Sequence, residues 1–137
     1  MKCLRALVLV LVPLLGGRSG AAEPLDQWQL RTNPAISNNL NAVTFGDDRF
    51  VAVGIKGTIA WSSDGATWLP VASGTTRDLF SVAHGNGVFV AGATGNRFFV
   101  SNDGLDWTER TTPSPDSPNW YGLTFGDGQL GASPSCR

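Results

Sequence analysis

The sequence predicts an all-β fold: a partial β-propeller of four-stranded antiparallel blades, preceded by a signal peptide. Three observations support this prediction. The 137 residues include 17 glycines and 8 prolines, which suits short strands joined by tight turns. Strand-like segments recur at a spacing of about 40 residues, which favours propeller blades over helical solenoids. Asp-Gly pairs also fall at matching places in the repeat, and such pairs are typical of hairpin turns.

The first 22 residues have the layout of a secretory signal peptide. Lys2 and Arg5 give a positive start, an apolar run covers 6–15, and mostly small residues lead to Ala22, after which we expect cleavage. Ten apolar residues are too few to cross a bilayer, for which a helix needs about 20. We therefore expect a secreted, periplasmic or cell-surface protein with no membrane span once the leader is removed.

Two patterns repeat in phase through the rest of the chain, residues 23–137. A strand pattern ending at Gly46 recurs at Gly85 and Gly126, at spacings of 39 and 41 residues. A hairpin pattern, Ser62-Ser-Asp-Gly-Ala-Thr-Trp68, recurs 39 residues later as Ser101-Asn-Asp-Gly-Leu-Asp-Trp107. These repeats predict the following units: an outer strand without a blade of its own at 27–32, blade 1 at 40–73, blade 2 at 79–112 and an incomplete blade 3 at 119–137.

Each complete blade is predicted to hold four strands. In blade 1 the turns leave strands at 41–45, 49–53, 58–62 and 67–72, and the same division holds from 80 to 112. One position of the first strand is small in all three repeats, which predicts that this strand lies innermost, where blades converge. The residues at that position are Ala42, Ser81 and Gly122.

The third repeat departs from this pattern after Leu130. Residues 131–137 replace the second strand that the repeat leads us to expect, and no third Asp-Gly hairpin follows. Closed propellers have about four to eight blades. We therefore interpret the chain as a fragment of a longer propeller, with self-association as the alternative way to supply further blades and cover exposed strand edges.

The two hairpins resemble the Asp-box, or BNR repeat, of sialidase-like, sortilin-like and photosystem II assembly-factor-like propellers. The residues that carry the resemblance are Ser62, Asp64, Gly65, Trp68, Ser101, Asp103, Gly104 and Trp107. In the usual Asp-box one residue separates Asp and Gly, whereas here the two are adjacent. The resemblance implies a structural motif in which Asp accepts backbone hydrogen bonds and the tryptophan packs inward.

Few residues suggest catalysis or metal binding. The formal net charge of −1 argues against nucleic acid as a partner. The single histidine, His84, takes the strand position of Phe45 and Phe125, so a packing role is favoured over a catalytic base. The turn positions of Asp64 and Asp103 favour structural capping over acid-base chemistry or calcium binding. No cofactor is expected, because the sequence also lacks clustered His and Cys ligands.

Two functions are compatible with these features. We favour a non-catalytic binding or scaffold module for an extracellular protein or glycan, because loops on a rigid scaffold commonly carry recognition. Its candidate ligand-face residues are Lys56, Arg77, Asp78, Asn96 and Asn119. The alternative is a fragment of a sialidase-like glycoside hydrolase, and the family resemblance implies that such an enzyme needs a Tyr nucleophile with a Glu partner and clustered arginines. Tyr121 is the single tyrosine and Glu109 falls in an outer strand, so we expect no enzyme activity.

Overall fold

A computed structural model describes residues 33–113 and 119–134, and within these ranges the fold is almost entirely antiparallel β-sheet. The first sheet contains β1 (Leu40–Gly46), β2 (Arg49–Gly54), β3 (Ile59–Ser62) and β4 (Leu69–Val71), in that order. A single 3-10 turn, η1 (Ile55–Gly57), joins β2 to β3. The second sheet contains β5 (Leu79–Gly85), β6 (Val88–Ala93), β7 (Arg97–Ser101) and β8 (Thr108–Thr111). The third contains β9 (Trp120–Gly126) and β10 (Gln129–Pro134).

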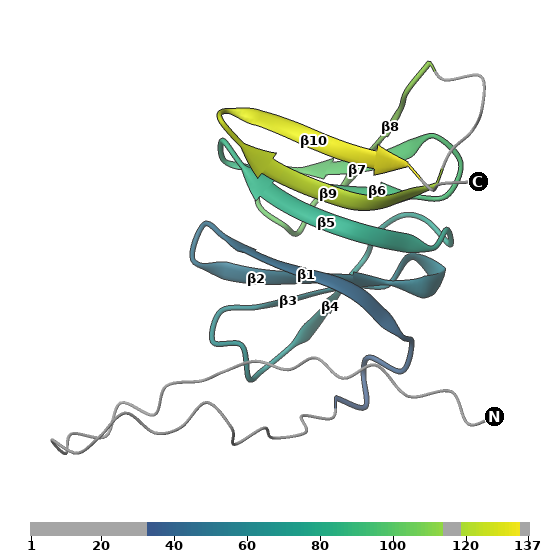
Figure 1. The fold of residues 1–137 in the computed structure, drawn as a ribbon. Helices are drawn as coiled ribbons and strands as arrows, with labels where there is room; N and C mark the ends of the chain where they lie inside the picture. Colours follow the sequence, from purple (N-terminus) through teal and green to yellow (C-terminus); the bar gives the residue numbers. More distant parts are fainter. Residues whose placement is uncertain (1–32, 114–118, 135–137) are drawn as a thin grey trace, which may run out of the picture.

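The three sheets stack face to face, and none of them closes into a barrel within the described ranges (Figure 1). The first strands β1, β5 and β9 follow one another through the stack, where β5 contacts β1 on one side and β9 on the other. Each sheet is a simple up-and-down meander, because short turns join strands that are neighbours in the sequence. The predicted all-β class and the four-stranded antiparallel repeats are therefore confirmed. The predicted signal peptide and the outer strand at 27–32 lie outside the described residues.

Two details of the predicted strands need correction. The strand expected at 67–72 is shorter, Leu69–Val71, because the amides of Ala66 and Thr67 bond to the Asp64 carboxylate and not to a neighbouring strand. The second strand of the third repeat was expected to be lost after Leu130, yet β10 continues to Pro134 and pairs with β9 along its length. Ladder pairing is made by the backbone, so the loss of the Val-Ala-Val pattern removes apolar side chains without preventing the strand.

The turns that follow the first strands share one backbone conformation. The central residues of these turns have positive φ in all three repeats: 47° and 56° at Asp47 and Asp48, 51° and 71° at Asn86 and Gly87, and 51° and 74° at Asp127 and Gly128. Two consecutive positive φ values are typical of the type I′ turn, which matches the twist of antiparallel strands. The Asp, Asn and Gly residues found here are those that adopt this conformation at low cost.

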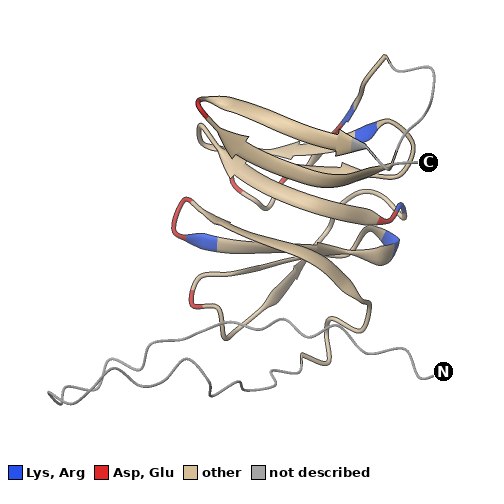
Figure 2. Ribbon diagram, viewed as in Figure 1, with Lys and Arg blue, Asp and Glu red and all other residues tan. Residues whose placement is uncertain are grey.

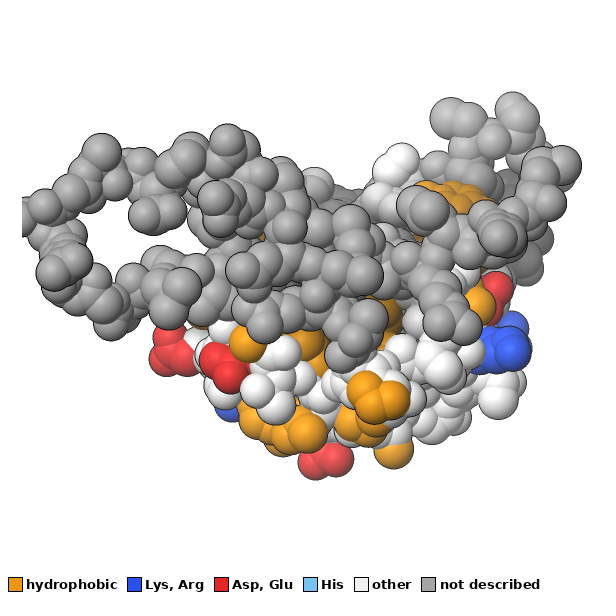
Figure 3. All heavy atoms as spheres, turned by 90° about the horizontal axis from the view of Figure 1, so that it is seen from below, with side chains coloured by type: hydrophobic (Ala, Val, Ile, Leu, Met, Phe, Trp, Pro, Cys, Tyr) orange, Lys and Arg blue, Asp and Glu red, His pale blue; other side chains and the backbone are white. Residues whose placement is uncertain are grey.

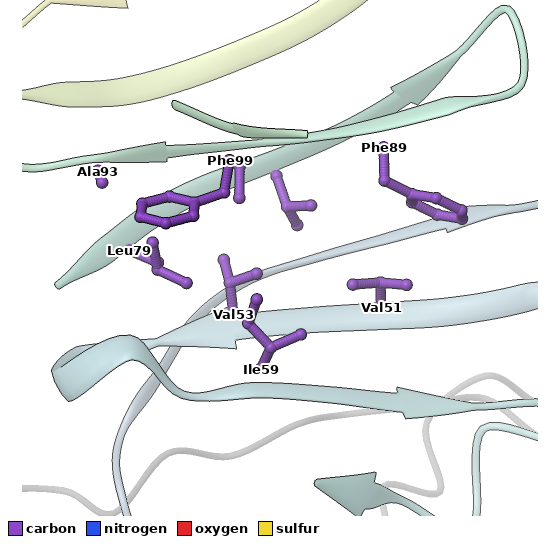
Figure 4. Packing of buried hydrophobic residues seen from close by; sticks show 9 residues of the cluster. Val51, Val53, Ile59, Leu79, Phe89, Ala93 and Phe99 are labelled. Atoms are coloured by element: carbon purple, nitrogen blue, oxygen red, sulfur yellow. The ribbon is translucent and has the colours of Figure 1, made fainter. Parts of the chain in front are cut away.

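The main core lies between the first and second sheets (Figure 4). Val51, Val53 and Ile59 of the first sheet point toward Leu79 and Phe89 of the second, and all five are essentially inaccessible to solvent. Val82, Ala91, Ala93 and Phe99 complete this cluster, and Trp107 packs against it. Trp68 is also buried, in a smaller cluster with Ala52 and Ala60. Burial of apolar surface between successive sheets is therefore what holds the stack together.

Candidate functional site

The first acidic hairpin, between β3 and β4, is a closed network of hydrogen bonds. The Asp64 carboxylate accepts bonds from the backbone amides of Ala66 (2.8 Å) and Thr67 (2.7 Å) and from the Ser62 hydroxyl (2.9 Å). The Ser62 oxygen accepts in turn from the Gly65 amide at 2.8 Å. The Trp68 indole donates to the Gly65 carbonyl at 3.1 Å, which fixes the ring beside the turn. These contacts satisfy polar groups that the turn would otherwise leave unpaired.

The second hairpin, between β7 and β8, repeats this network. Asp103 accepts from the amides of Leu105 (2.8 Å) and Asp106 (2.9 Å) and from the Ser101 hydroxyl (3.0 Å). Gly104 donates to Ser101 at 2.8 Å and accepts from the Trp107 indole at 3.1 Å. The same residue types at the same spacing thus produce the same local structure twice.

The hydrogen bonds lower the pKa of both carboxyl groups. For Asp64 the amides of Thr67 and Ala66 and the Ser62 hydroxyl lower the pKa from 3.8 to about 2. The amides of Asp106 and Leu105 are the main cause of a lowered pKa at Asp103. A carboxylate with these bonds is held ionised, whereas a general acid needs a raised pKa to carry its proton near neutral pH. The geometry gives both groups a structural task.

We expect the hairpins to make stability fall in acid. Because folding lowers the pKa of Asp64, its contribution is fully present above the unfolded value of 3.8 and is lost as the pH falls toward about 2. Urea unfolding at a series of pH values from 6 to 2 should show this loss, and the loss should be smaller in Asp64→Asn. An unchanged pH profile in that variant would contradict the structural role.

The two ends of the stack carry different charges (Figure 2). Most acidic residues lie at the hairpin end, in the β1–β2, β3–β4 and β9–β10 turns, where Arg49 at the start of β2 is also found, and most basic residues lie at the opposite end, together with Asp78. The basic residues at that opposite end, which we call the loop end, include Lys56 in η1, Arg77 just before β5 and Arg97 at the start of β7. Arg97 forms an ion pair with Glu109, whereas Lys56 and Arg77 have no ion-pair partner among the described residues. The loop end is therefore the better candidate for binding an anionic group.

An open hollow of about 860 Å³ lies at this loop end, between η1 and the segment that leads from β4 to β5. Lys56 and Arg77 stand in its lining, which is otherwise formed by small or uncharged residues: Gly57, Val71, Ala72, Ser73, Gly74, Thr75 and Thr76. The lining contains no aromatic ring that could stack on a sugar. Its recognisable chemistry is two cations beside hydroxyl groups and backbone amides.

The close approach of η1 to the loop depends on Gly57. A Cβ added at Gly57 would lie 2.8 Å from the Ser73 hydroxyl and would overlap the Thr75 carbonyl oxygen. The Ser73 hydroxyl donates to the same carbonyl at 3.2 Å and accepts from the Thr75 amide. Gly57 and Ser73 shape the hollow but were not among the residues predicted for it, because their contact joins segments that do not repeat from sheet to sheet.

The other candidate ligand-face residues form hydrogen bonds that connect the loops at the loop end to one another. Asp78 accepts a hydrogen bond from the Lys56 amide at 2.8 Å, and Asn119 accepts one from the Gly95 amide at 3.2 Å. Asp78 and Asn119 precede β5 and β9, so each links the first strand of one sheet to the β2–β3 or β6–β7 turn of the sheet before it. Asn96 lies in the β6–β7 turn, where its carbonyl accepts from the Thr112 amide. Of the five predicted residues, the structure brings Lys56 and Arg77 together at the hollow.

The residues required by the hydrolase alternative are far apart in the fold. Tyr121 is an exposed residue of β9, in the third sheet. Glu109 is an exposed residue of the outer strand β8, where Arg97 pairs with it. Asp64 and Asp103 lie in the hairpins at the opposite end from the hollow. The described residues therefore bring together no tyrosine, carboxylate and arginine cluster.

Metal-binding clusters and membrane-spanning helices are absent from the described residues. No group of three or more His, Cys, Asp or Glu side chains in these ranges is placed to hold a metal ion. No helix in these ranges is long and apolar enough to cross a membrane.

Comparison with known proteins assigns no family to this arrangement. No family model matches the chain, and no curated protein matches it significantly.

Proposed function

We propose that the chain is an exported, non-catalytic recognition module of the β-propeller type, which binds an anionic group of an extracellular protein or glycan at its loop end. The observation that carries this proposal is the hollow lined by Lys56 and Arg77, two exposed cations without an ion-pair partner among the described residues. The carboxylates of Asp64 and Asp103 are occupied by backbone hydrogen bonds, which supports a structural task for the hairpins.

The propeller assignment is supported by three features. All three sheets stack through their first strands, and the first two sheets are four-stranded meanders. Their hairpins share the hydrogen-bond network of Ser62 and Asp64 with Ser101 and Asp103, and their sequence resembles the Asp-box. The layout of the first 22 residues supports export.

The charge of the hollow sets the expected strength of binding. Asp78 lies beside Lys56 and Arg77 and offsets part of their positive charge, so an excess of about one charge is left for a ligand. Ion pairs in such exposed places contribute about 0.2–1 kcal/mol each and weaken with salt. We therefore expect weak, salt-sensitive binding of carboxylate or sulfate groups.

Titration with two probes tests this function. A heparin-derived oligosaccharide supplies sulfate and carboxylate on a glycan, and a glutamate-rich peptide supplies carboxylate on a protein. The double substitution Lys56→Asn with Arg77→Gln should lower the affinity for the probe that binds roughly tenfold. Asn suits position 56 because Lys56 has a positive φ of 54°, a conformation that Asn adopts readily. Chemical shifts of backbone amides report binding to each probe.

The matched control is Arg110→Gln. Arg110 is an exposed residue of β8 that does not line the hollow, so its loss also removes a positive charge and should leave binding almost unchanged. Equal losses in the control and in the double variant would point to net charge and not to the hollow. Turnover of a fluorogenic sialoside by the unmodified chain would contradict the non-catalytic function.

A further inference from the structure

One contact recurs at both interfaces between sheets: an aromatic ring covers a glycine. The His84 ring of β5 lies over Gly46 of β1, and the Phe125 ring of β9 lies over Gly85 of β5. A Cβ added at either glycine would overlap the ring. The two contacts are equivalent in the repeat. In both, the ring belongs to the next-to-last residue of a first strand, and the glycine is the last residue of the first strand in the preceding sheet.

The same interfaces are also matched in their polar contacts. At the first interface the Asn41 side chain donates to the Leu79 carbonyl at 2.7 Å, and at the second the Ser81 hydroxyl donates to the Trp120 carbonyl at 2.8 Å. Leu79 and Trp120 are the first residues of β5 and β9. A side chain of one first strand thus binds the start of the next one in both cases.

At each interface one first strand makes most of the close backbone contacts, while side chains of β3, β6 and β7 also contribute to the core of the first interface. At the first, β5 packs on β1 and β2, and at the second, β9 packs on β5 and β6. The first strand of one sheet therefore docks on the first two strands of the preceding sheet. We call the docking first strand the presenting half of the interface and the first two strands of the preceding sheet its receiving half. Both halves also occur at the two ends of the described stack: β1 is a presenting strand, and β9 with β10 forms a receiving pair.

The outward face of β1 exposes the docking residues. Val43 is 48% exposed and Phe45 is 56% exposed, whereas their counterpart Val82 is 6% exposed and the His84 side chain 14%. Hydrophobic side chains are visible on this side of the stack in Figure 3. Phe45 already packs on Phe50, with ring centroids 4.7 Å apart, as His84 packs on Phe89 at 4.3 Å. The presenting half of the interface is therefore formed without a partner among the described residues.

The outward face of the third sheet offers the receiving half. Gly126 is the counterpart of Gly46 and Gly85, yet nothing lies within 4 Å of a Cβ placed on it. Its surroundings are less apolar than those of the inner glycines, because Gly131 stands at the repeat position of Val51 and Val90. The open space over Gly126 could receive the ring of Phe45, as Gly46 receives the ring of His84. A contact at Gly126 would bury less apolar surface.

We propose that a second copy of this chain docks on the first, with Phe45 of one copy over Gly126 of the other. One chain cannot join its own two ends, because β1 and the third sheet lie on opposite sides of the stack (Figure 1). The contact is heterologous, since each copy uses a different face, so association can continue head to tail. The lower apolar content of the receiving half makes the association weak and dependent on concentration. This inference does not depend on the proposed ligand or on the loop end.

Cysteine cross-linking tests the register of the contact. In a background of Cys3→Ser and Cys136→Ser, one preparation carries Phe45→Cys and another carries Gly126→Cys. Neither change should disturb the fold, because Phe45 is exposed and position 126 has free space. Oxidised glutathione should then give a covalent dimer from the mixture at least tenfold more abundantly than from either preparation alone. Circular dichroism checks that both variants keep the fold.

The inner interface supplies the positive control. Gly85→Cys with Phe125→Cys in one chain should form an intramolecular disulfide, because the ring at 125 occupies the place of a Cβ at 85. If this control closes while the mixture gives no dimer, the proposal is wrong and the β1 face is covered by residues 1–32 or by another partner. Dimers formed by Phe45→Cys alone would also overturn it, in favour of a face-to-face contact. Sedimentation velocity gives a second measurement: Gly126→Leu fills the open place and should abolish concentration-dependent association.

Discussion

Replacing Phe89 with alanine should lower the free energy of unfolding by about 3–5 kcal/mol, the usual cost of deleting a buried phenylalanine ring. Phe89 is fully buried between the first two sheets, where it contacts the His84 ring and belongs to the same cluster as Val51. The expected loss is a large part of the roughly 5–15 kcal/mol that stabilises a typical domain. The reason is that the ring fills the space between two sheets, so its removal leaves a cavity at the interface.

Urea unfolding followed by tryptophan fluorescence measures this loss. The control is Leu69→Ala, because Leu69 is 49% exposed on the short strand β4 and should cost much less. If both variants lost the same stability, burial between the sheets would not be the main source of cohesion.

Replacing Gly57 with alanine should destabilise the chain by at least about 2 kcal/mol. The left-handed backbone conformation alone costs a residue with a side chain about 1–2 kcal/mol, and Gly57 has a φ of 69°. The new Cβ would also press on the Thr75 carbonyl and the Ser73 hydroxyl, which forces the loop away from η1. The hollow should then change shape, so binding at the loop end should weaken together with stability.

Gly74→Ala separates the two causes. Gly74 has nearly the same φ, 70°, but nothing lies within 4 Å of a Cβ placed there. This variant therefore carries only the conformational cost, roughly 1–2 kcal/mol. Equal effects of the two substitutions on stability and binding would show that the contact of η1 with the loop does not matter.

The repeat in the sequence predicted much of the fold, because identical residue types at identical spacing meet the same local forces. The Asp64 and Asp103 hairpins, with their serine partners and tryptophans, were expected from the sequence alone. Strand β10 was not, because its backbone pairing survives the loss of the apolar pattern. The hollow was only partly foreseen: Lys56 and Arg77 were candidates, but Gly57 and Ser73 acquire their role from a contact between segments that do not repeat.

Position in the stack explains the remaining differences between equivalent residues. Val43 and Val82 occupy the same place in the repeat, and their strands have the same register with their neighbours. One is exposed and the other buried because, within the ranges that the structure describes, Val82 packs against a preceding sheet and Val43 does not. A sequence repeat predicts the conformation of each unit, but not which of its surfaces is left open.

The glycine contacts allow the most direct test of the stacked arrangement on which the function rests. We expect nuclear Overhauser effects between the His84 ring and the Hα protons of Gly46, and between the Phe125 ring and those of Gly85. The Hα protons of Gly126 should show no such contact at low protein concentration. Absence of both inner contacts in a folded sample would contradict the stacking of the sheets and, with it, the placement of the loop end.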